Sequence, residues 1–406
     1  MTDVPTTVGA LWEAWLPTAR WFGAKGLGFR VCGVKVLPPY VDQPGTVIRS
    51  ELIDVDVAEP AGTVRQQYHV IAGYVEPTSA PEGLIGRALF AGRPHDVVDA
   101  LVCPATRDAF VRQQCPDLPA DAPARLLAFS SNTLVAAGDV VLKIARRLPG
   151  GLLAEAEALA ALKDAGIAPR LLWAIAAEEQ VLGIALERLD ATDGWELAVA
   201  SARAGRPFAD EARALGRTLR ALHERFARAF ATGVHQVTFD ADLDAACAQV
   251  PALAALRPAL ATILRAPASP VPVQRVHGDF HLQQTMRTTD GWRVIDFEGE
   301  PLRADRDLLD SPLRDVAGAI RSFDYARAQA AAPAGWRDDA IAAFLDGYGT
   351  IDDPKLLRAY IVGKALYETV YETRNRPEWV HIPLRAVEDE ARRAEPGPAA
   401  TRQEYS

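Results

Sequence analysis

Residues 277–301 read HGDFHLQQTMRTTDGWRVIDFEGEP, and this stretch decides the fold. It follows one short β-like run, Gln274–Val276, and contains another, Arg293–Phe297. The Asp290-Gly291 pair ahead of the second run is typical of a hairpin turn. The stretch therefore predicts a polar loop, a β-hairpin and an aspartate at the end of a strand, in that order.

Three side chains of this stretch suit phosphoryl transfer, which needs a carboxylate base, oxygen ligands for magnesium and a lysine on the phosphates. Asp279 lies on the loop that follows the first run, where a general base is expected. Gln284 offers an amide oxygen further along the loop, and Asp296 ends the second run. We expect the three to converge on one site for magnesium and phosphate. In the alternative, Asp279 caps a turn and Asp296 is a surface carboxylate. This alternative does not explain why Asp279, Gln284 and Asp296 occur together at this spacing.

A lysine lies inside the β-branched run 140–145, VVLKIA. The alternation of a strand turns Lys143 to the same side as Val141, and a charge there is costly without anionic partners. We expect those partners to be the phosphates of ATP and Glu157 of the next helix. Glu155 is the competing partner, on a different face of that helix. The alternative is a lysine on an edge strand that faces water.

The turn before this strand is expected to cover the phosphates through Ser131, Asn132 and Thr133, although it has no glycine. The pattern GxxxxGK[ST] does not occur in the chain, which excludes a P-loop enzyme.

Residues 364–379, KALYETVYETRNRPEW, predict an acceptor site. Their large polar and aromatic side chains recur three or four positions apart, so they share one face of a helix and suit a polyhydroxylated sugar. His281 is a further candidate, as is Asp315, which is expected to orient the catalytic loop or to favour a helix N-terminus. The alternative is a plain amphipathic helix with solvated charges. The residues assigned to the acceptor on this helix are Tyr367, Glu368, Tyr371, Glu372 and Arg374.

The remaining chain predicts an α+β protein of two or three packed units. Residues 1–100 predict a mainly β module, residues 101–190 a β-rich nucleotide-binding lobe, and residues 191–406 a mostly helical lobe with the catalytic loop and the sugar site. The expected strands lie at Val31–Leu37, Val47–Val57, Gln67–Tyr74, 126–138, 140–145 and 181–189. The expected helices lie at Leu11–Leu16, 152–165, Ala209–Phe230, from Ser311-Pro312 onward and at Lys355–Arg374, and residues 391–406 are expected to form a frayed tail.

Composition narrows the range of partners. The chain has 406 residues, of which 49% are hydrophobic and 24% charged, and its net charge of -9 argues against nucleic acid and anionic membranes as partners. We expect no membrane span and no signal peptide. The cysteines are scattered, which favours neither zinc nor disulfides and suggests a cytoplasmic protein. They are Cys32, Cys103, Cys115 and Cys247.

Two of these motifs, HGDFHLQQ at 277–284 and IDFEGEP at 295–301, resemble the catalytic and magnesium motifs of aminoglycoside phosphotransferase-like kinases. Three more narrow the resemblance to bacterial maltokinases: ARWFGAKG at 19–26, DSPLRDVAGAIRSFDYA at 310–326 and YETVYETRNRPEWVHIPL at 367–384. The likeness spans nearly the whole chain. It implies a bilobal, protein-kinase-like fold with an N-terminal cap domain, and transfer of phosphate from ATP to maltose.

Carried over to this chain, the resemblance makes Asp279 the catalytic base, Gln284 and Asp296 magnesium ligands, and Lys143 the phosphate contact anchored by Glu157. The resemblance also implies that maltose 1-phosphate enters a trehalose-to-glycogen route and that a trehalose synthase, which supplies maltose, is a partner. The cap signature contains Arg20, Trp21 and Lys25.

The chain departs from the family pattern in its catalytic loop, where Phe280 and Gln283 replace Leu and Gly, and it is shorter between Gly194 and Leu222. Both departures bear on the identity of the acceptor more than on the type of reaction. The alternatives are a kinase for another sugar or amino sugar, such as glucosamine or an aminoglycoside, and a catalytically dead kinase fold that acts as a binding module.

Overall fold

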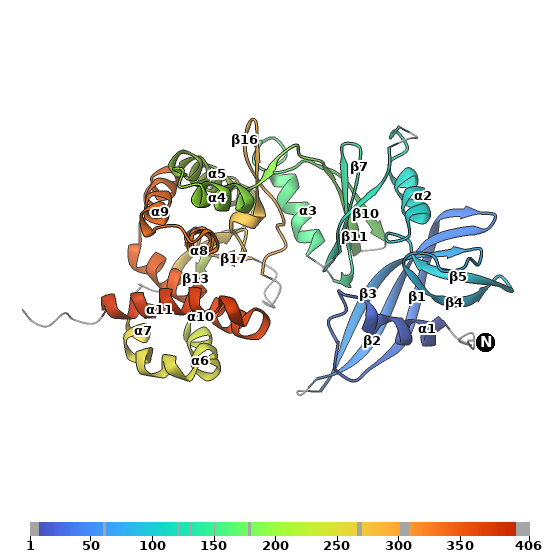
Figure 1. The fold of residues 1–406 in the computed structure, drawn as a ribbon, viewed down its shortest axis with the longest axis horizontal. Coiled ribbons are helices and arrows are strands. Elements are labelled where there is room, and N and C mark those ends of the chain that lie inside the picture. The colour runs from blue at the N-terminus through green and yellow to red at the C-terminus, as the bar shows by residue number, and fades with distance from the viewer. Residues whose placement is uncertain are drawn as a thin grey trace, which may run out of the picture. The chain divides into compact units, whose positions relative to one another are not determined.

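The computed structural model describes residues 8–59, 62–119, 122–129, 131–149, 151–177, 180–265, 270–300 and 308–394. The chain divides into two compact units. The first comprises Met1–Ala160 and Pro169–Leu189, and the second comprises Ala161–Ala168 and Asp190–Ser406. Figure 1 shows that strands dominate the first unit and helices the second, as expected for an α+β protein.

The first unit opens with an antiparallel sheet in the order β1-β2-β3-β5-β4, with β9 paired to β3. Helix α1 packs on this sheet, and Trp12 on α1, Phe22 and Tyr68 on β3 lie in the shared core. The first three expected strands lie within β1, β2 and β3. The bounds are α1 Val8–Trp15, η1 Leu16–Thr18, β1 Phe29–Gln43, β2 Thr46–Glu59, β3 Gly62–Val75, β4 Leu84–Phe90, β5 Arg93–Asp99 and β9 Arg147–Leu148.

A second antiparallel sheet, in the order β10-β11-β8-β7-β6, completes this unit. Side chains from both sheets share one hydrophobic cluster, in which Ile48 and Ile71 of the first meet Val135 and Leu142 of the second. The division into separate cap and nucleotide-binding domains near residue 100 stays a prediction. The bounds are α2 Pro104–Gln114, β6 Arg125–Phe129, β7 Asn132–Ala137, β8 Val140–Ala145, α3 Leu152–Ala161, β10 Leu171–Ala177 and β11 Gln180–Glu187.

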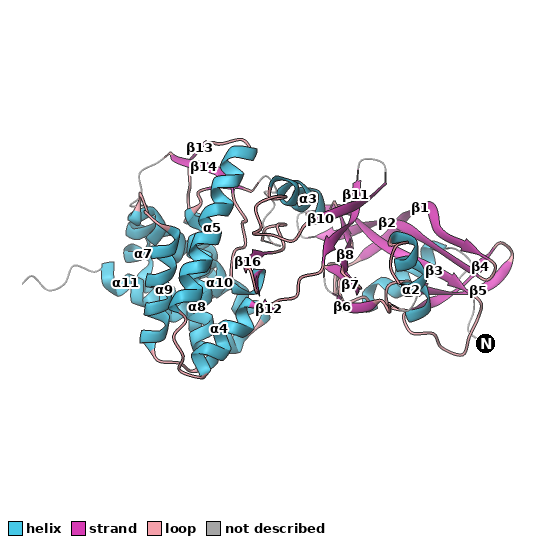
Figure 2. Cartoon of the chain, turned by 90° about the horizontal axis from the view of Figure 1, so that it is seen from above, coloured by secondary structure: helices cyan, strands magenta, loops and turns pink. Residues whose placement is uncertain are grey.

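The second unit is mostly helical, and Figure 2 shows its long helices side by side. Two small sheets accompany them, β12-β15-β16 and β13-β14-β17. The helices are α4 Gly194–Arg203, α5 Ala209–Ala229, α6 Asp240–Gln249, η2 Pro251–Leu256, α7 Arg257–Leu264, η3 Leu282–Gln284, α8 Leu313–Ala330, α9 Ala334–Tyr348, α10 Pro354–Asn375, η4 Pro377–Trp379 and α11 His381–Ala394. The strands are β12 Thr192–Asp193, β13 Gly233–His235, β14 Val271–Arg275, β15 Thr285–Thr288, β16 Gly291–Val294 and β17 Leu309–Asp310.

The helical periodicity of α5 predicts its buried face. The apolar positions recur every three or four residues along the helix, and the structure buries all of them. They are Ala212, Leu215, Leu219, Leu222 and Phe226. Buried faces of this kind fix the helices that carry the site.

Several expected boundaries differ from the structure. The strand expected over residues 126–138 is two strands, β6 and β7, and the helix expected over 152–165 ends at Ala161. Strand β16 ends at Val294 rather than at Phe297, because Ile295 leaves the sheet to hydrogen-bond through its backbone with the catalytic loop. Helix α8 begins at Leu313, one residue after the expected proline. Residues 391–394 are the last turn of α11, which buries Ala391, and are not part of a tail; residues 395–406 lie outside the described residues.

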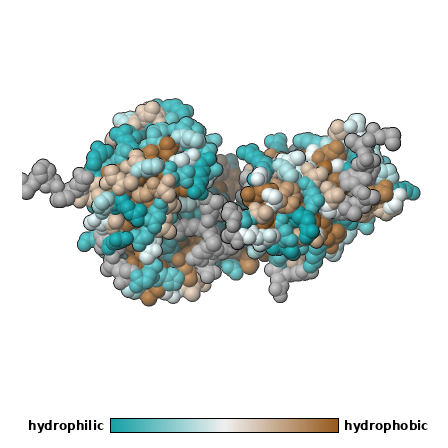
Figure 3. Space-filling view, turned by 90° about the horizontal axis from the view of Figure 1, so that it is seen from below, coloured by the Kyte–Doolittle hydropathy of each residue, from teal (hydrophilic) through white to brown (hydrophobic). Residues whose placement is uncertain are grey.

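Within the described ranges, no helix is long and apolar enough to cross a membrane. The face of the molecule in Figure 3 mixes hydrophilic with hydrophobic residues. The four cysteines are free thiols.

Candidate active site

The buried carboxylate of Asp315 holds the loop that carries Asp279. Asp315, in the first turn of α8, accepts hydrogen bonds from the backbone N–H groups of His277 and Gly278 at 2.8 and 2.9 Å. Its Oδ2 also lies 2.9 Å from Nε2 of His223 on α5. Burial opposes ionisation of Asp315, but His223 and the loop outweigh it and lower its pKa. Asp315 therefore orients the loop, one of its two expected roles.

His277 and two glycines fix the shape of the loop. His277 is fully buried, its Nε2 lies 2.9 Å from the backbone oxygen of Ile295, and burial lowers its pKa, which favours the neutral ring. Gly278 has φ 86°, a conformation that side chains disfavour. A Cβ on Gly318 of α8 would stand 2.3 Å from the backbone oxygen of Phe280, so only glycine allows α8 to pack this closely.

Asp279 points to a lysine that sequence reasoning missed. Nζ of Lys364, on α10, lies 3.3 Å from Oδ1 of Asp279 and also binds Glu300. Burial alone would raise the pKa of Asp279, but Lys364 and His281 overcome it and hold the pKa well below the usual carboxylate range. The carboxylate is therefore ionised at neutral pH, as proton acceptance requires.

The two expected metal ligands lie together. Nε2 of Gln284 is 3.2 Å from Oδ2 of Asp296, and an amide can present either its oxygen or its nitrogen to such a position. Asp296 has φ 65°, an uncommon conformation for a residue other than glycine, which holds its carboxylate at the end of the hairpin. A carboxylate and an amide oxygen at one point fit a hard cation such as magnesium.

A cavity of about 520 Å³ opens beside Asp279 and Lys364, within the second unit. Helices α8 and α10 form its walls, while Trp195 of α4 and Trp379 of η4 contribute rings. Of the expected acceptor residues, His281, Tyr367, Glu368, Tyr371 and Glu372 line it.

Two expected acceptor residues, Asp315 and Arg374, lie outside the cavity. Arg374 is exposed and does not line the cavity; its guanidinium donates to Oε1 of Gln249 at 3.2 Å. It has the helical spacing of Tyr371, three positions earlier, but its side chain contacts Gln249 at the end of α6 rather than the cavity. Arg376, one turn beyond Glu372, lines the cavity instead and pairs with Glu372 at 2.6 Å.

Sequence reasoning also overlooked several cavity residues, though one signal was available. Lys364, Glu368 and Glu372 recur every four residues, so the acceptor face that was assigned to α10 extends one turn further towards its start. The cavity-lining residues of α8, from Gly318 to Gln329, also recur every three or four positions. The overlooked lining residues are Trp195, Glu300, Gly318, Ser322, Tyr325, Gln329, Lys364, Arg376 and Trp379.

The two residues of the catalytic loop that depart from the family pattern, Phe280 and Gln283, lie in different environments. Phe280 is buried, and its ring meets that of His277 edge-on at 5.7 Å. Gln283 is exposed and lines the cavity. Gln283 is therefore the departure that faces the cavity.

In the first unit, Lys143 is 5% exposed and lies on β8, a strand with neighbours on both sides, so the edge-strand alternative is wrong. Its Nζ donates to Oε2 of Glu155 at 2.6 Å. Glu155 sits on the buried face of α3, whereas Glu157, two residues on, is exposed. The anchor of Lys143 is thus Glu155 and not the expected Glu157.

The expected phosphate-covering turn joins β6 to β7. Ser131 is exposed on this turn, whereas Asn132 and Thr133 are buried at the start of β7. Thr133 accepts a hydrogen bond from Nε of Arg146 at 2.7 Å through its hydroxyl. Ser131 is therefore the member of the trio that is open to solvent.

Comparison with solved structures defines the class of fold. A glucosamine kinase (crystal form B) superposes with a TM-score of 0.66 at 22% identity, covering 94% of this chain and 99% of that chain. A glucosamine kinase in complex with glucosamine, ADP and inorganic phosphate gives a TM-score of 0.61 at 22% identity, over 96% and 99% of the two chains. The chain thus has the mixed α+β fold of these kinases.

Sequence comparison supplies the family. Residues 130–360, more than half of the chain, match the phosphotransferase enzyme family, and the chain belongs to it. Glucosamine kinase of Streptacidiphilus jiangxiensis is 32% identical over 138 residues, 29% of this chain and 32% of that protein. Glucosamine kinase of Mycolicibacterium smegmatis is 32% identical over 136 residues, 29% of this chain and 34% of that protein. These matches span about a third of each relative. The expected phosphotransferase family is confirmed.

Proposed function

We propose that the protein is an ATP-dependent kinase whose acceptor is an amino sugar of the glucosamine type. Membership in the phosphotransferase family, the ionised Asp279 at a cavity and the names of the similar proteins support this proposal. The amino-sugar reading replaces maltose as the leading candidate.

The observation that carries the proposal is the state of Glu368 in the acceptor cavity. Its Oε2 binds Arg321 at 2.8–2.9 Å, while its Oε1 has no hydrogen bond within the described part of the chain. Burial raises the pKa of Glu368 despite the positive charges of Arg321 and Lys364. Oε1 is thus the carboxylate oxygen that remains for a ligand in the cavity, and the ammonium group of an amino sugar would donate a charged hydrogen bond to it.

In the proposed reaction, Asp279 accepts the proton of an acceptor hydroxyl while the hydroxyl oxygen attacks the γ-phosphorus of ATP. The bond between that phosphorus and the oxygen of ADP breaks, so ADP leaves with the electron pair. Lys364 holds Asp279 in place and offsets the negative charge near the transferred group. A base that stays ionised until the transfer suits this step.

The nucleotide side of the proposal rests on the first unit. Lys143, fixed by Glu155, would contact the phosphates of ATP, and the turn with Ser131 would cover them. Magnesium held by Gln284 and Asp296 would neutralise the phosphate charge. The reduced state of the cysteines suits the cytoplasmic setting that we propose.

Maltose is a second candidate because of the maltokinase-like segments and the aromatic end of the cavity. Rings of Tyr325 and Trp379 stack there at 6.0 Å between centroids, and sugar faces pack well on such rings. With maltose as acceptor, the product would feed trehalose-to-glycogen metabolism, and a trehalose synthase would be the partner.

The test is an ADP-release assay with magnesium over glucosamine, maltose, glucose, trehalose and an aminoglycoside. We expect the highest kcat/KM with glucosamine. A higher kcat/KM with maltose would move the assignment to maltokinase. Absence of ADP release with every acceptor, under conditions where ATP binds, would favour the catalytically dead binding module.

A further inference from the structure

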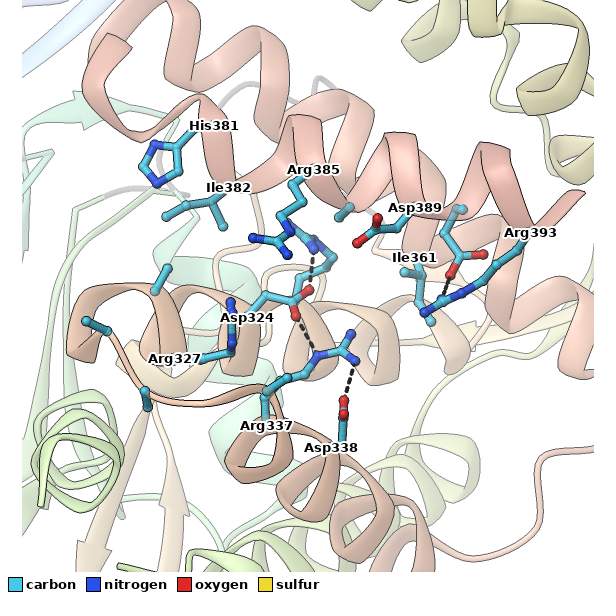
Figure 4. Close-up of a pocket in the computed structure, with 17 residues that line it drawn as sticks. Asp324, Arg327, Arg337, Asp338, Ile361, His381, Ile382, Arg385, Asp389 and Arg393 are labelled. Carbon is cyan, nitrogen blue, oxygen red and sulfur yellow. Dashed lines mark hydrogen bonds and ion pairs between the residues drawn. The ribbon is translucent and has the colours of Figure 1, made fainter. Parts of the chain in front are cut away.

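A second cavity, of about 440 Å³, lies between α8, α9 and α11, with Ile361 of α10 on its wall (Figure 4). It uses a different face of α8 from the acceptor cavity. Arg321, Asp324 and Ala328 line the second cavity, and they follow one another every three or four residues. Nothing in the proposed phosphoryl transfer uses this cavity.

Its carboxylates are all paired already. Figure 4 shows the chain of ion pairs that runs from Asp324 through Arg337 to Asp338. Arg321 also binds Asp324, and Glu390 is shared by two arginines. The pairs are Arg337–Asp324 at 2.6 Å, Arg337–Asp338 at 2.8 Å, Arg358–Glu390 at 2.7 Å, Arg393–Glu390 at 2.5 Å, Arg321–Asp324 and Arg392–Asp389. Arginines thus outnumber the carboxylates that line this cavity.

Two lining arginines keep free donors. Arg327 on α8 and Arg385 on α11 reach the cavity from facing helices, and neither has an ion pair to any residue that the structure describes. Nε of Arg327 is buried and has no hydrogen-bond partner there. A buried donor without a partner costs free energy, so an oxygen that entered the cavity would stabilise this nitrogen.

The start of α9 faces the same space. Ala334, its first residue, lines the cavity, and Pro333 before it provides no side-chain cap. The backbone N–H groups of a first helical turn lack partners within the helix and carry partial positive charge. Guanidinium groups together with a helix N-terminus are the donors that bind phosphate oxygens in proteins.

We propose that this cavity binds a small phosphate-bearing anion through Arg327, Arg385 and the N-terminus of α9. The chain carries a net charge of -9, so this excess of positive charge is local and runs against the overall charge. Inorganic phosphate and the phosphate of a metabolite share the chemistry that the site recognises, several oxygens around one centre that accept hydrogen bonds from guanidinium groups.

The experiment is calorimetric titration of the full chain with inorganic phosphate at constant ionic strength, for the wild type and Arg327→Gln/Arg385→Gln. The double variant should lose a phosphate site or weaken it by about tenfold or more, because two charged hydrogen-bond donors are removed. A parallel titration with glucose 1-phosphate distinguishes a metabolite from free phosphate by which of the two binds more tightly. Tighter binding of either anion supports the site if the double variant abolishes that binding.

The matched control is Arg393→Gln, which removes a charge from the same cavity but from an arginine that Glu390 already holds. It should change phosphate affinity less than about threefold. If the double variant unfolds, Arg385→Gln alone replaces it, because that side chain is exposed on α11. Phosphate binding identical in the wild type and in Arg385→Gln or the double variant would overturn the proposal, as would equal affinity for acetate.

Discussion

The two cavities on either side of α8 are built from the same kinds of side chain, yet they retain opposite unpaired groups. Towards α10, Glu368 keeps one carboxylate oxygen without a described partner. Towards α11, Arg327 keeps a buried N–H without one. The ion pair between Arg321 and Glu368 connects the two walls. The group left over after pairing, rather than the number of charges, is therefore the basis of both proposed ligands.

The largest expected effect tests the base of the acceptor cavity. Asp279→Asn should keep nucleotide binding and lower kcat by about 10²-fold or more, the contribution of a positioned general base. The measurement is steady-state ADP release together with ATP titration. Asp290→Asn, on the exposed hairpin turn, is the control and should keep normal turnover. Near-normal turnover of Asp279→Asn would remove this residue from the role.

A smaller effect is expected from Lys364→Met. Asp279 is faced by Lys364 and Glu300, and by His281 and His277 of its own loop. Lys364 lowers the pKa of Asp279 and burial opposes it, so removing the lysine raises the pKa. The folded site then keeps its ionised base only at higher pH. The acid limb of the kcat/KM profile should therefore move upward by about one pH unit or more.

The control for this shift is Lys355→Met, an exposed lysine at the start of the same helix. Its profile should match the wild type. If the acid limb stays in place in Lys364→Met while kcat falls, the lysine acts on the transferred group and not on the base.

The smallest effect concerns the outer end of the acceptor cavity. Tyr371→Ala should raise the acceptor KM by about threefold to tenfold, the cost of one lost ring contact, with little change in kcat. Arg374→Ala, on the same helix but outside the cavity, should leave KM unchanged. An equal rise in KM for both variants would place the acceptor elsewhere on α10. Initial rates over a range of glucosamine concentrations decide between these outcomes.

Local patterns predicted the fold class and much of the catalytic segment. The alternation of hydrophobic residues predicts β2 and β8, and the Asp290-Gly291 pair predicts the β15–β16 hairpin, because these features are determined over a few residues. The spacing of the α10 residues correctly indicates a shared face for Tyr367, Glu368 and Glu372.

What the sequence does not predict depends on contacts between distant segments. Lys364 and Asp279 are 85 positions apart, and their ion pair exists only because α10 packs beside the loop. The choice of Glu155 over Glu157 follows from which face of α3 meets the sheet, and both faces carry a glutamate. Arg374 has the helical spacing of Tyr367 and Tyr371, and only its contact with Gln249, 125 positions away in the sequence, shows that it lies outside the cavity.

The most direct test of the acceptor assignment compares glucosamine with glucose, which differ at carbon 2 by an ammonium group in place of a hydroxyl. We predict that kcat/KM for glucosamine exceeds that for glucose by about tenfold or more, because Glu368 gains a charged hydrogen bond from the ammonium group. In Glu368→Gln, most of this preference should disappear. Equal kcat/KM values for the two sugars in the wild type, or an unchanged preference in Glu368→Gln, would contradict it.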